Sequence, residues 1–464
     1  MSTSNTSPLD QNVFDPQAAA ELREKRKAKI ESSLAKRHRK EKTFRIFGFT
    51  SVIIGLAFVA LLFGSILYKG LPAFWQASMK VSVFFDPKLI DAGARPTQEA
   101  GESPAHFQER FVSWQSKMGL VDWDALIANG LIAKDPSLES HRDELTSLYT
   151  SSEAYRIRDM VFKDPDLVGK KIDLTLLADA NIDVWLAGNI DRSLPDEQQQ
   201  LSPEVRKLAD SLAAKGVIER SFNTQLFTNP DSRSSPATAG LAGAFLGSLF
   251  MMLIVIVISI PLGVASAIYL EEFAPKNFIT DLIEVNINNL AAVPSIVFGL
   301  LGAAIFIGWM HLPISAPVVG GLVLSLMTLP TVIITTRASL KAVPPSIRQA
   351  ALGIGASRIQ TVFHHVLPLA LPGIMTGAII GIAHALGETA PLLLIGMSAF
   401  VANIPVSPLD QSTALPVQVY LWQGNELRNF FEGRTAAAII VLLALMVGLN
   451  SFAIWLRKKF EVRW

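Results

Sequence analysis

Residues 343–357 read VPPSIRQAALGIGAS, and they stand between two long hydrophobic runs of the sequence. The two consecutive prolines break any helix that precedes them, and Ser346 can cap a new one. Gly353 and Gly355 predict the end of this short helix and a sharp turn after it. Ala350 and Ala351, which lie between the prolines and these glycines, give the helix a small, flat face, which suits docking into the groove of a partner protein.

The hydrophobic runs around this segment predict a membrane protein. Half of the 464 residues are apolar, and only 17% are charged, against roughly 25% in soluble domains. Runs of about 20 apolar residues are long enough to cross a bilayer core of about 30 Å. The sequence therefore predicts an all-α polytopic membrane protein with six spans, at residues 46–68, 234–270, 285–310, 316–336, 368–397 and 435–456.

The N-terminal part predicts how the chain is oriented in the membrane. Residues 1–45 form a polar tail, and residues 21–45 carry 11 Lys or Arg against 4 Asp or Glu. An uncharged run follows at 46–68, too long for a cleaved signal peptide, so it is expected to be a retained first span. By the positive-inside rule the basic tail should lie in the cytoplasm, and nucleic-acid binding is the weaker alternative for it.

Residues 69–238 have the composition of a soluble domain. They carry 19 Lys or Arg against 25 Asp or Glu, and four tryptophans offer material for a core. Ser202 to Lys215 has helical spacing and stops before Gly216. Because this domain follows the first span, it is expected on the outer, periplasmic side.

The remaining segments, 239–456, are expected to form a permease core, followed by a cytoplasmic tail at 457–464. The loop 337–365 carries four Lys or Arg and no acid, and the tail carries four more. By the positive-inside rule, the Lys and Arg residues of both segments predict that the loop and the tail lie in the cytoplasm. With an even number of spans, both termini are then expected on that side. No long internal repeat is present, which favours a permease that pairs with a second subunit.

The loop 337–367 resembles the EAA coupling loop of ABC-importer permeases, whose usual form is Glu-Ala-Ala, three residues, Gly and then Leu-Pro. Here the matching residues are Gln349-Ala350-Ala351, Gly355 and Leu367-Pro368, with Gln349 in place of the usual Glu. The resemblance implies that this loop docks on an ATPase subunit. The residues it assigns to coupling are Arg348, Gln349, Ala350, Ala351, Gly355 and Ser357.

The chain is expected to have no catalytic site of its own. It contains no Gly-x-x-x-x-Gly-Lys-Ser/Thr motif for binding nucleotide phosphates and no cysteine. The histidines are not spaced with carboxylates as metal ligands are, so no metal and no cofactor is expected here. ATP and magnesium should be used by separate ATPase subunits.

The run 368–397 contains a charged pair, His384 and Glu388, within otherwise apolar sequence. A charge at the centre of a span costs about 2.5–3.5 kcal/mol, so such residues usually have a function. Four residues apart on a helix, the two would share one face. Two interpretations stay open: this face lines a translocation pathway, or the pair holds helices together as polar glue.

Residues 387–393, Gly-Glu-Thr-Ala-Pro-Leu-Leu, and the Pro-Ser-Ile-Val segment at 294–297 resemble permeases of bacterial phosphate importers. Together with residues 181–186, they indicate the A-type permeases of phosphate-specific transport (Pst) systems, in the subgroup with a large periplasmic insertion. Many members have Arg where His384 stands, so here the positive charge would depend on pH. The resemblance assigns the pathway to His384, Glu388, Thr389 and Ser295.

This resemblance implies a complex in the bacterial inner membrane that imports inorganic phosphate. Its other members would be a second, C-type permease, two ATP-binding subunits and a periplasmic phosphate-binding protein, with no nucleic acid. The domain at 69–238 is expected to help dock the binding protein. Two alternatives remain: a permease for a related oxyanion such as sulfate or molybdate, and a membrane sensor, which lacks a cytoplasmic output module.

Overall fold

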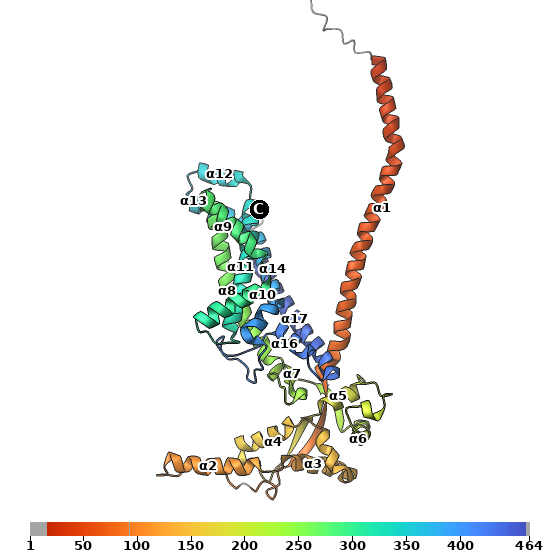
Figure 1. The fold of residues 1–464 in the computed structure, drawn as a ribbon, viewed down its shortest axis with the longest axis vertical. Coiled ribbons are helices and arrows are strands. Elements are labelled where there is room, and N and C mark those ends of the chain that lie inside the picture. Colours follow the sequence, from red (N-terminus) through yellow and green to blue (C-terminus); the bar gives the residue numbers. More distant parts are fainter. Residues whose placement is uncertain (1–15, 92, 461–464) are drawn as a thin grey trace, which may run out of the picture. The chain divides into compact units, whose positions relative to one another are not determined.

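The computed structural model describes residues 16–91 and 93–460 (Figure 1). The predicted tail segments at 1–15 and 461–464 lie outside the described residues. The chain divides into two units, one ending at Ser65 and one beginning at Ile66, and each is described by itself.

The first unit is essentially one helix, α1, which spans Pro16–Gly70 and enters the second unit at its end. Its first half is the basic segment and its second half is the apolar run predicted as the first span. No break separates the two halves. An unbroken helix satisfies its own backbone hydrogen bonds, as a segment inside a bilayer must.

The second unit begins with a soluble domain built on a small sheet. Strand β1, Trp75–Phe84, lies between β2, Lys171–Leu177, and β3, Ile218–Phe222, and both pairings are antiparallel. Alternate residues of β1 point into a core that the surrounding helices complete. These helices are α2, Pro104–Gly119; α3, Trp123–Lys134; α4, Ser152–Lys163; α5, Ala180–Ala187; α6, Pro203–Ala214; and α7, Gln225–Thr228.

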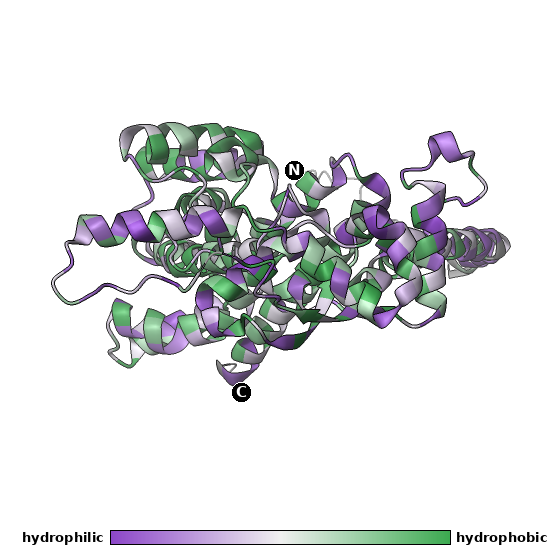
Figure 2. Cartoon of the chain, turned by 90° about the horizontal axis from the view of Figure 1, so that it is seen from below, coloured by the Kyte–Doolittle hydropathy of each residue, from purple (hydrophilic) through white to green (hydrophobic). Residues whose placement is uncertain are grey.

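The helix predicted at residues 202–215 is confirmed as α6. The hydroxyl of Ser202 accepts a hydrogen bond from the Val205 N–H at 3.3 Å, and Gly216 adopts a φ of +68° just after the helix ends. The sequence analysis did not predict the sheet, whose strands lie far apart in the chain. Figure 2 shows hydrophilic and hydrophobic residues interspersed along these helices, as expected for elements with one wet and one buried face.

The rest of the second unit is helical and contains the membrane spans that follow α1. Including α1, five described helices are long and apolar enough to cross a bilayer, and a sixth span arises if the bent pair α9–α10 is counted as one. The fold class predicted from sequence is therefore confirmed. The helices are α8, Ala242–Ile268; α9, Phe278–Ala291; α10, Ser295–Gly302; α11, Pro317–Lys341; α14, Leu367–Gly387; α16, Leu415–Gln423; and α17, Arg428–Phe460.

Three details of the predicted spans differ from the structure. The span expected at 285–310 is divided into two helices, because α9 and α10 meet at an angle of 102° around Pro294. The span expected at 368–397 ends its helix α14 at Gly387, and the short helix α15, Ala390–Leu392, follows a break. The predicted loop at 398–433 contains the helix α16. Helix α8 runs on through Pro261 without ending there.

Helix α11 is the centre of the core, packed between α8 and α14. Small residues let the backbones approach closely, as is usual between membrane helices. A side-chain carbon added at Gly321 of α11 would lie 2.7 Å from Ile254 of α8, and one added at Gly263 of α8 would lie 2.7 Å from Val332 of α11. Such contacts leave no room for larger residues at either glycine.

The soluble domain is attached to the core through Arg434, which is buried near the start of α17. Its guanidinium donates to the carbonyls of Ala239 at 2.8 Å and Ala237 at 3.1 Å, and to the side-chain oxygen of Gln76 in β1 at 2.7 Å. That same oxygen accepts from the Asn223 amide at 2.6 Å. The buried cation therefore joins the sheet, the segment before α8 and α17.

A buried carboxyl lies at the same end of the sheet. Asp183 of α5 accepts a hydrogen bond from the Ala77 N–H at 2.7 Å, and Arg220 lies 3.9 Å away. Burial raises the pKa of the Asp183 carboxyl, and the hydrogen bond and the nearby guanidinium oppose that shift.

Replacing Arg434 with leucine should destabilise the second unit by about 3 kcal/mol, because several buried acceptors lose their donor together. The thermal unfolding midpoint of the detergent-solubilised protein would measure the change. Arg428→Leu is the control, since Arg428 lies on the same helix but is exposed. Equal midpoints for the two variants would show that the joint does not depend on this cation.

Candidate functional site

The segment that decides the fold forms a short helix at one end of the core. Helix α12, Pro345–Gly353, is followed by a turn and by α13, Arg358–Thr361. Figure 1 shows both at the end of the core away from the soluble domain. The helix begins directly at Pro345, so Ser346 does not cap it as expected.

The turn after α12 follows the predicted pattern. Gly355 adopts a φ of +93°, a conformation that strains residues with a side chain. Ser357 then caps α13: its hydroxyl accepts from the Gln360 N–H at 3.3 Å, while the Gln360 side chain accepts from the Ser357 N–H at 2.9 Å. The chain therefore reverses within a few residues and enters α14 through a π-helical turn at Val362–Val366.

The two predicted alanines lie on different faces of α12. Ala351 is buried, whereas Gln349 and Ala350 are exposed. Ile354 and Ile359 add large apolar surface beside them, at 84% and 62% exposure. The outward face of this end of the core is therefore small, apolar and uncharged at its centre, as a docking surface should be.

Arg348 does not belong to that outward face. Its guanidinium binds the carboxylate of Glu272 at 2.6 Å and donates to the carbonyls of Leu340 at 2.9 Å and Val343 at 2.8 Å. These contacts tie α12 to the end of α11 and to the π-helical turn Tyr269–Phe273 after α8. Glu272 is a residue that sequence reasoning missed, although opposite charges at neighbouring span ends could have indicated the pair.

The helix that carries the polar pair of the fifth predicted span ends between its two members. His384 is in the last turn of α14, but Glu388 has extended backbone angles, φ −78° and ψ 127°, and lies just outside the helix. At this C-cap position φ is still in the helical range and only ψ turns the following residues away, so the structure does not contradict the expectation that both residues lie on one side of α14. Both are described residues, and no hydrogen bond or ion pair joins them, so the structure does not bring them together as polar glue.

His384 belongs to an exposed stripe of α14. The stripe also contains Thr376, Ile380 and Gly387, which recur every three or four residues, while the opposite face is buried against α11. His384 thus points away from this chain's own core. Its surroundings are supplied by bilayer, water or another subunit.

The two helix breaks of the core lie against each other. Ser295 begins α10 just after the bend at Pro294, and Thr389 begins the turn of α15 just after Glu388. A side-chain carbon added at Gly299 of α10 would lie 2.7 Å from the Pro391 Cα of α15. The bend and the break are therefore neighbours in space, and broken helices inside a membrane expose polar backbone groups where a path needs them.

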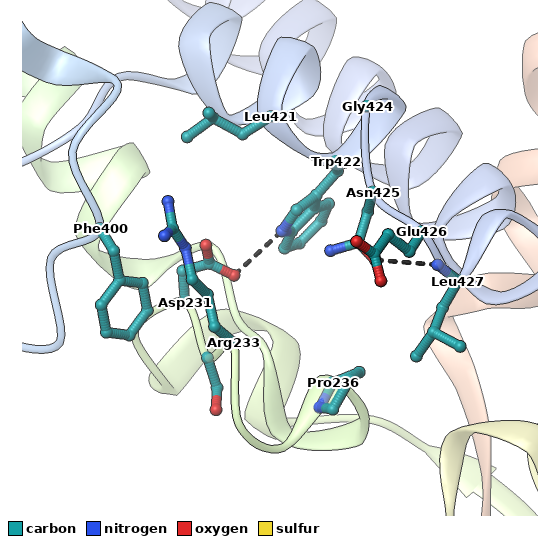
Figure 3. Close-up of a pocket in the computed structure, with 11 residues that line it drawn as sticks. Asp231, Arg233, Pro236, Phe400, Leu421, Trp422, Gly424, Asn425, Glu426 and Leu427 are labelled. Carbon is teal, nitrogen blue, oxygen red and sulfur yellow. Dashed lines mark hydrogen bonds between the residues drawn. The ribbon is translucent and has the colours of Figure 1, made fainter.

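A cavity of about 470 Å³ lies at the other end of the core, beside the soluble domain (Figure 3). The indole of Trp422 donates to Asp231 at 3.0 Å, and the Arg233 guanidinium stacks over the ring of Phe400 at 5.5 Å. Glu426, in the turn between α16 and α17, supplies a charge opposite to that of Arg233. None of these residues was predicted, because they come from segments almost 200 residues apart.

Two family profiles match separate parts of the chain. Residues 242–462 match the binding-protein-dependent transport system inner membrane component, and residues 31–196 match a domain of unknown function, DUF3333. The probable ABC transporter permease protein YqgI of Bacillus subtilis is 35% identical over 257 residues, which are 52% of this chain and 84% of that protein. This chain is an ABC-transporter permease.

A second permease and a solved transporter structure are also similar to this chain. The phosphate transport system permease protein PstA of Yersinia pestis is 31% identical over 258 residues, 54% of this chain and 83% of that protein. The methionine ABC transporter MetNI is 18% identical, with a TM-score of 0.36 over 48% of this chain and 95% of that one. The permease is therefore a non-catalytic, multi-pass membrane subunit of a bacterial ABC importer, and such permeases work with ATPase subunits and binding proteins.

In the permease, Gly355→Ala should weaken the coupling end, because an L-residue at this φ costs about 1–2 kcal/mol. The amount of ATPase subunit that co-purifies with the complex, and its ATP-driven uptake, are expected to fall several-fold. Gly353→Ala is the matched control, since it lies in α12 with no atom within 4 Å of an added side-chain carbon. If both variants retained full uptake, the shape of this turn would not matter for coupling.

Proposed function

We propose that this permease forms part of the pathway for inorganic phosphate in an importer of the bacterial inner membrane. The observation that carries the proposal is the 31% identity with a protein named a phosphate transport system permease, across 83% of that protein. The residues 242–462 that match the transport-component family include the Gly-Glu-Thr-Ala-Pro segment and the bend at Pro294. The alternative substrates are the related oxyanions sulfate and molybdate, and the uptake experiment below distinguishes them from phosphate.

The pathway is proposed to run along the exposed stripe of α14 and past the two helix breaks. His384 supplies a group that can carry a positive charge, and Ser295 and Thr389 supply hydroxyls at the breaks. Glu388 would not attract an anion by itself, because like charges repel. Its proposed role is to hold a cation or a proton near the path, so that the anion passes a site with balanced charge.

A second, C-type permease is the proposed neighbour of this stripe. The bent span leaves large apolar side chains exposed, among them Phe278 at 79% and Leu300 at 59%. A pathway between two permeases would cover such a face and place His384 at its centre. The ATP-binding subunits are proposed to dock on α12, around Gln349 and Ala350, while ATP and magnesium remain their ligands.

The soluble domain is proposed to face the periplasm and to help dock a phosphate-binding protein. It lies at the end of the core away from α12, and the cavity lined by Arg233 and Glu426 opens beside it (Figure 3). Both termini would then lie in the cytoplasm. A domain attached rigidly through Arg434 can report binding directly to α17.

The substrate would be tested by ATP-driven uptake of radiolabelled inorganic phosphate into vesicles that hold this chain with its partner subunits. Uptake should require ATP and persist in excess sulfate, because a phosphate-binding protein selects the anion before the permease receives it. Competition by sulfate or molybdate, or no phosphate uptake, would move the substrate to those oxyanions.

Replacing His384 with alanine should lower phosphate uptake about tenfold while leaving assembly and basal ATP hydrolysis unchanged, because the change removes one favourable interaction of about 1.4 kcal/mol along the path. His365→Ala is the control, since His365 is also exposed but lies in the turn before α14. Loss of assembly in the His384 variant would favour a structural role instead. Unchanged uptake would remove His384 from the pathway.

A further inference from the structure

Four acidic and basic side chains meet where α8 and α11 end, against the middle of α9 and close to α12. Arg337 of α11 binds Glu284 of α9 at 2.5 Å and Glu271 of the turn after α8 at 3.4 Å. Lys341, one turn further along α11, lies 3.6 Å from Glu271. We refer to Arg337, Glu271 and Glu284 as the Arg337 clamp, because one guanidinium joins three elements.

The clamp is largely shielded from water. The side chains of Arg337, Glu271 and Glu284 are 14%, 19% and 33% exposed, whereas Lys341 is 58% exposed. Ion pairs at an open surface contribute little, but removing one member of a shielded pair leaves a charge without compensation. Arg337 therefore determines whether α9 stays against α11, and Lys341 is only the rim of the cluster.

The clamp and α12 share their attachment points. Arg348 of α12 binds Glu272, which is the direct neighbour of Glu271, and also the carbonyls at the end of α11. Both α12 and α9 are thus fixed to the same turn and to the same helix end. A force that moves α12 should move the turn, the end of α11 and, through Arg337, α9.

Helix α9 continues into the bend that lies beside the broken span. After Ala291 the chain turns by 102° at Pro294 and enters α10, where Gly299 contacts Pro391. A displacement of α9 would therefore reach the bend and the break near Glu388 without passing through any long flexible segment.

We propose that Arg337 is a positioning residue for transport, which makes α9 move as one body with α12. Movement of α12 driven by the ATPase subunits then changes the bend at Pro294. The inference rests on the proposed docking of α12 on an ATPase subunit. Without the guanidinium, Glu271 and Glu284 would face each other as like charges and α9 would separate from α11.

The first test measures coupling in the full complex, with both permeases, the ATPase subunits and the binding protein reconstituted in vesicles. Arg337→Gln should lower ATP-driven uptake of radiolabelled phosphate about tenfold, while ATP hydrolysis stays within about twofold, so more ATP is consumed per anion. Lys341→Gln, in the same cluster but on its exposed rim, should leave both rates within about twofold. Normal uptake by the Arg337 variant would overturn the proposal.

The second test measures the movement directly and does not depend on the transported anion. The chain has no cysteine, so spin labels can be placed at Ser346→Cys at the start of α12 and Asp281→Cys in α9, both exposed, with other subunits free of accessible cysteine. The distance between the labels should be the same in the nucleotide-free and ATP-bound complexes. With Arg337→Gln added, it should differ between the two states.

The two tests separate the clamp from the function on which it rests. A label distance that changes with ATP in the complex with native Arg337 overturns the clamp, whatever solute is carried. ATPase subunits that bind the complex equally well after the outward face of α12 is altered by Ala350→Arg would instead refute the docking proposal. If Arg337→Gln prevented assembly, the label distance with native Arg337 would still decide.

Discussion

The close packing of small residues around α11 is the contact that positions the rest of the permease core. Gly263 and Gly321 let α8 and α11 approach until side chains of one helix touch the backbone of the other. In a bilayer no hydrophobic effect drives helices together, so such van der Waals contact has to hold the bundle. Because α8 and α11 are fixed to each other, their ends form a stable base on which α12 and the Arg337 clamp are built.

At the ends of α8 and α11, ion pairs rather than contacts between small residues hold the elements together. Arg348 donates to two carbonyls at the end of α11 and also binds Glu272, so these contacts fix the orientation of α12 after Pro344. Arg337 fixes α9 to the end of α11 through Glu284, and it also binds Glu271 in the turn after α8. Partly shielded ion pairs have strict geometry, and they couple elements that share little apolar contact. The end of the core that carries α12 is therefore held by several ion pairs, whereas its outward face is small and apolar.

At the other end, the buried cation of Arg434 and an apolar cluster around Trp422 and Phe431 join the soluble domain to the core. Arg434 is compensated mainly by carbonyls and by an amide oxygen, and these come from β1 and from the segment before α8. The domain is consequently not a loosely tethered appendage of the second unit. Together with the cavity beside Trp422, it forms an outer surface continuous with α16 and α17.

Local patterns in the sequence were sufficient for the helical membrane fold, for α6 with its end before Gly216, and for the turn at Gly355. Hydrophobic length, capping and the demand for glycine at positive φ are local properties, and they act wherever the chain goes. Pro294 and Gly387 with Pro391 mark positions where a helix can bend, but the 102° size of the first bend and the strand pairing of the sheet could not be predicted in this way. Both depend on contacts between distant segments, as Gly299 against Pro391 illustrates.

The same division applies to the candidate site. The sequence by itself determined which residues are unusual: His384 and Glu388 in apolar surroundings, and Gln349 to Gly355 between spans. Only the tertiary structure decided that α14 ends at Gly387, between His384 and Glu388, and that Arg348 turns inward to Glu272. It also brought Arg337 to Glu284, because the pairing of charges 53 residues apart depends on which helix ends meet in space.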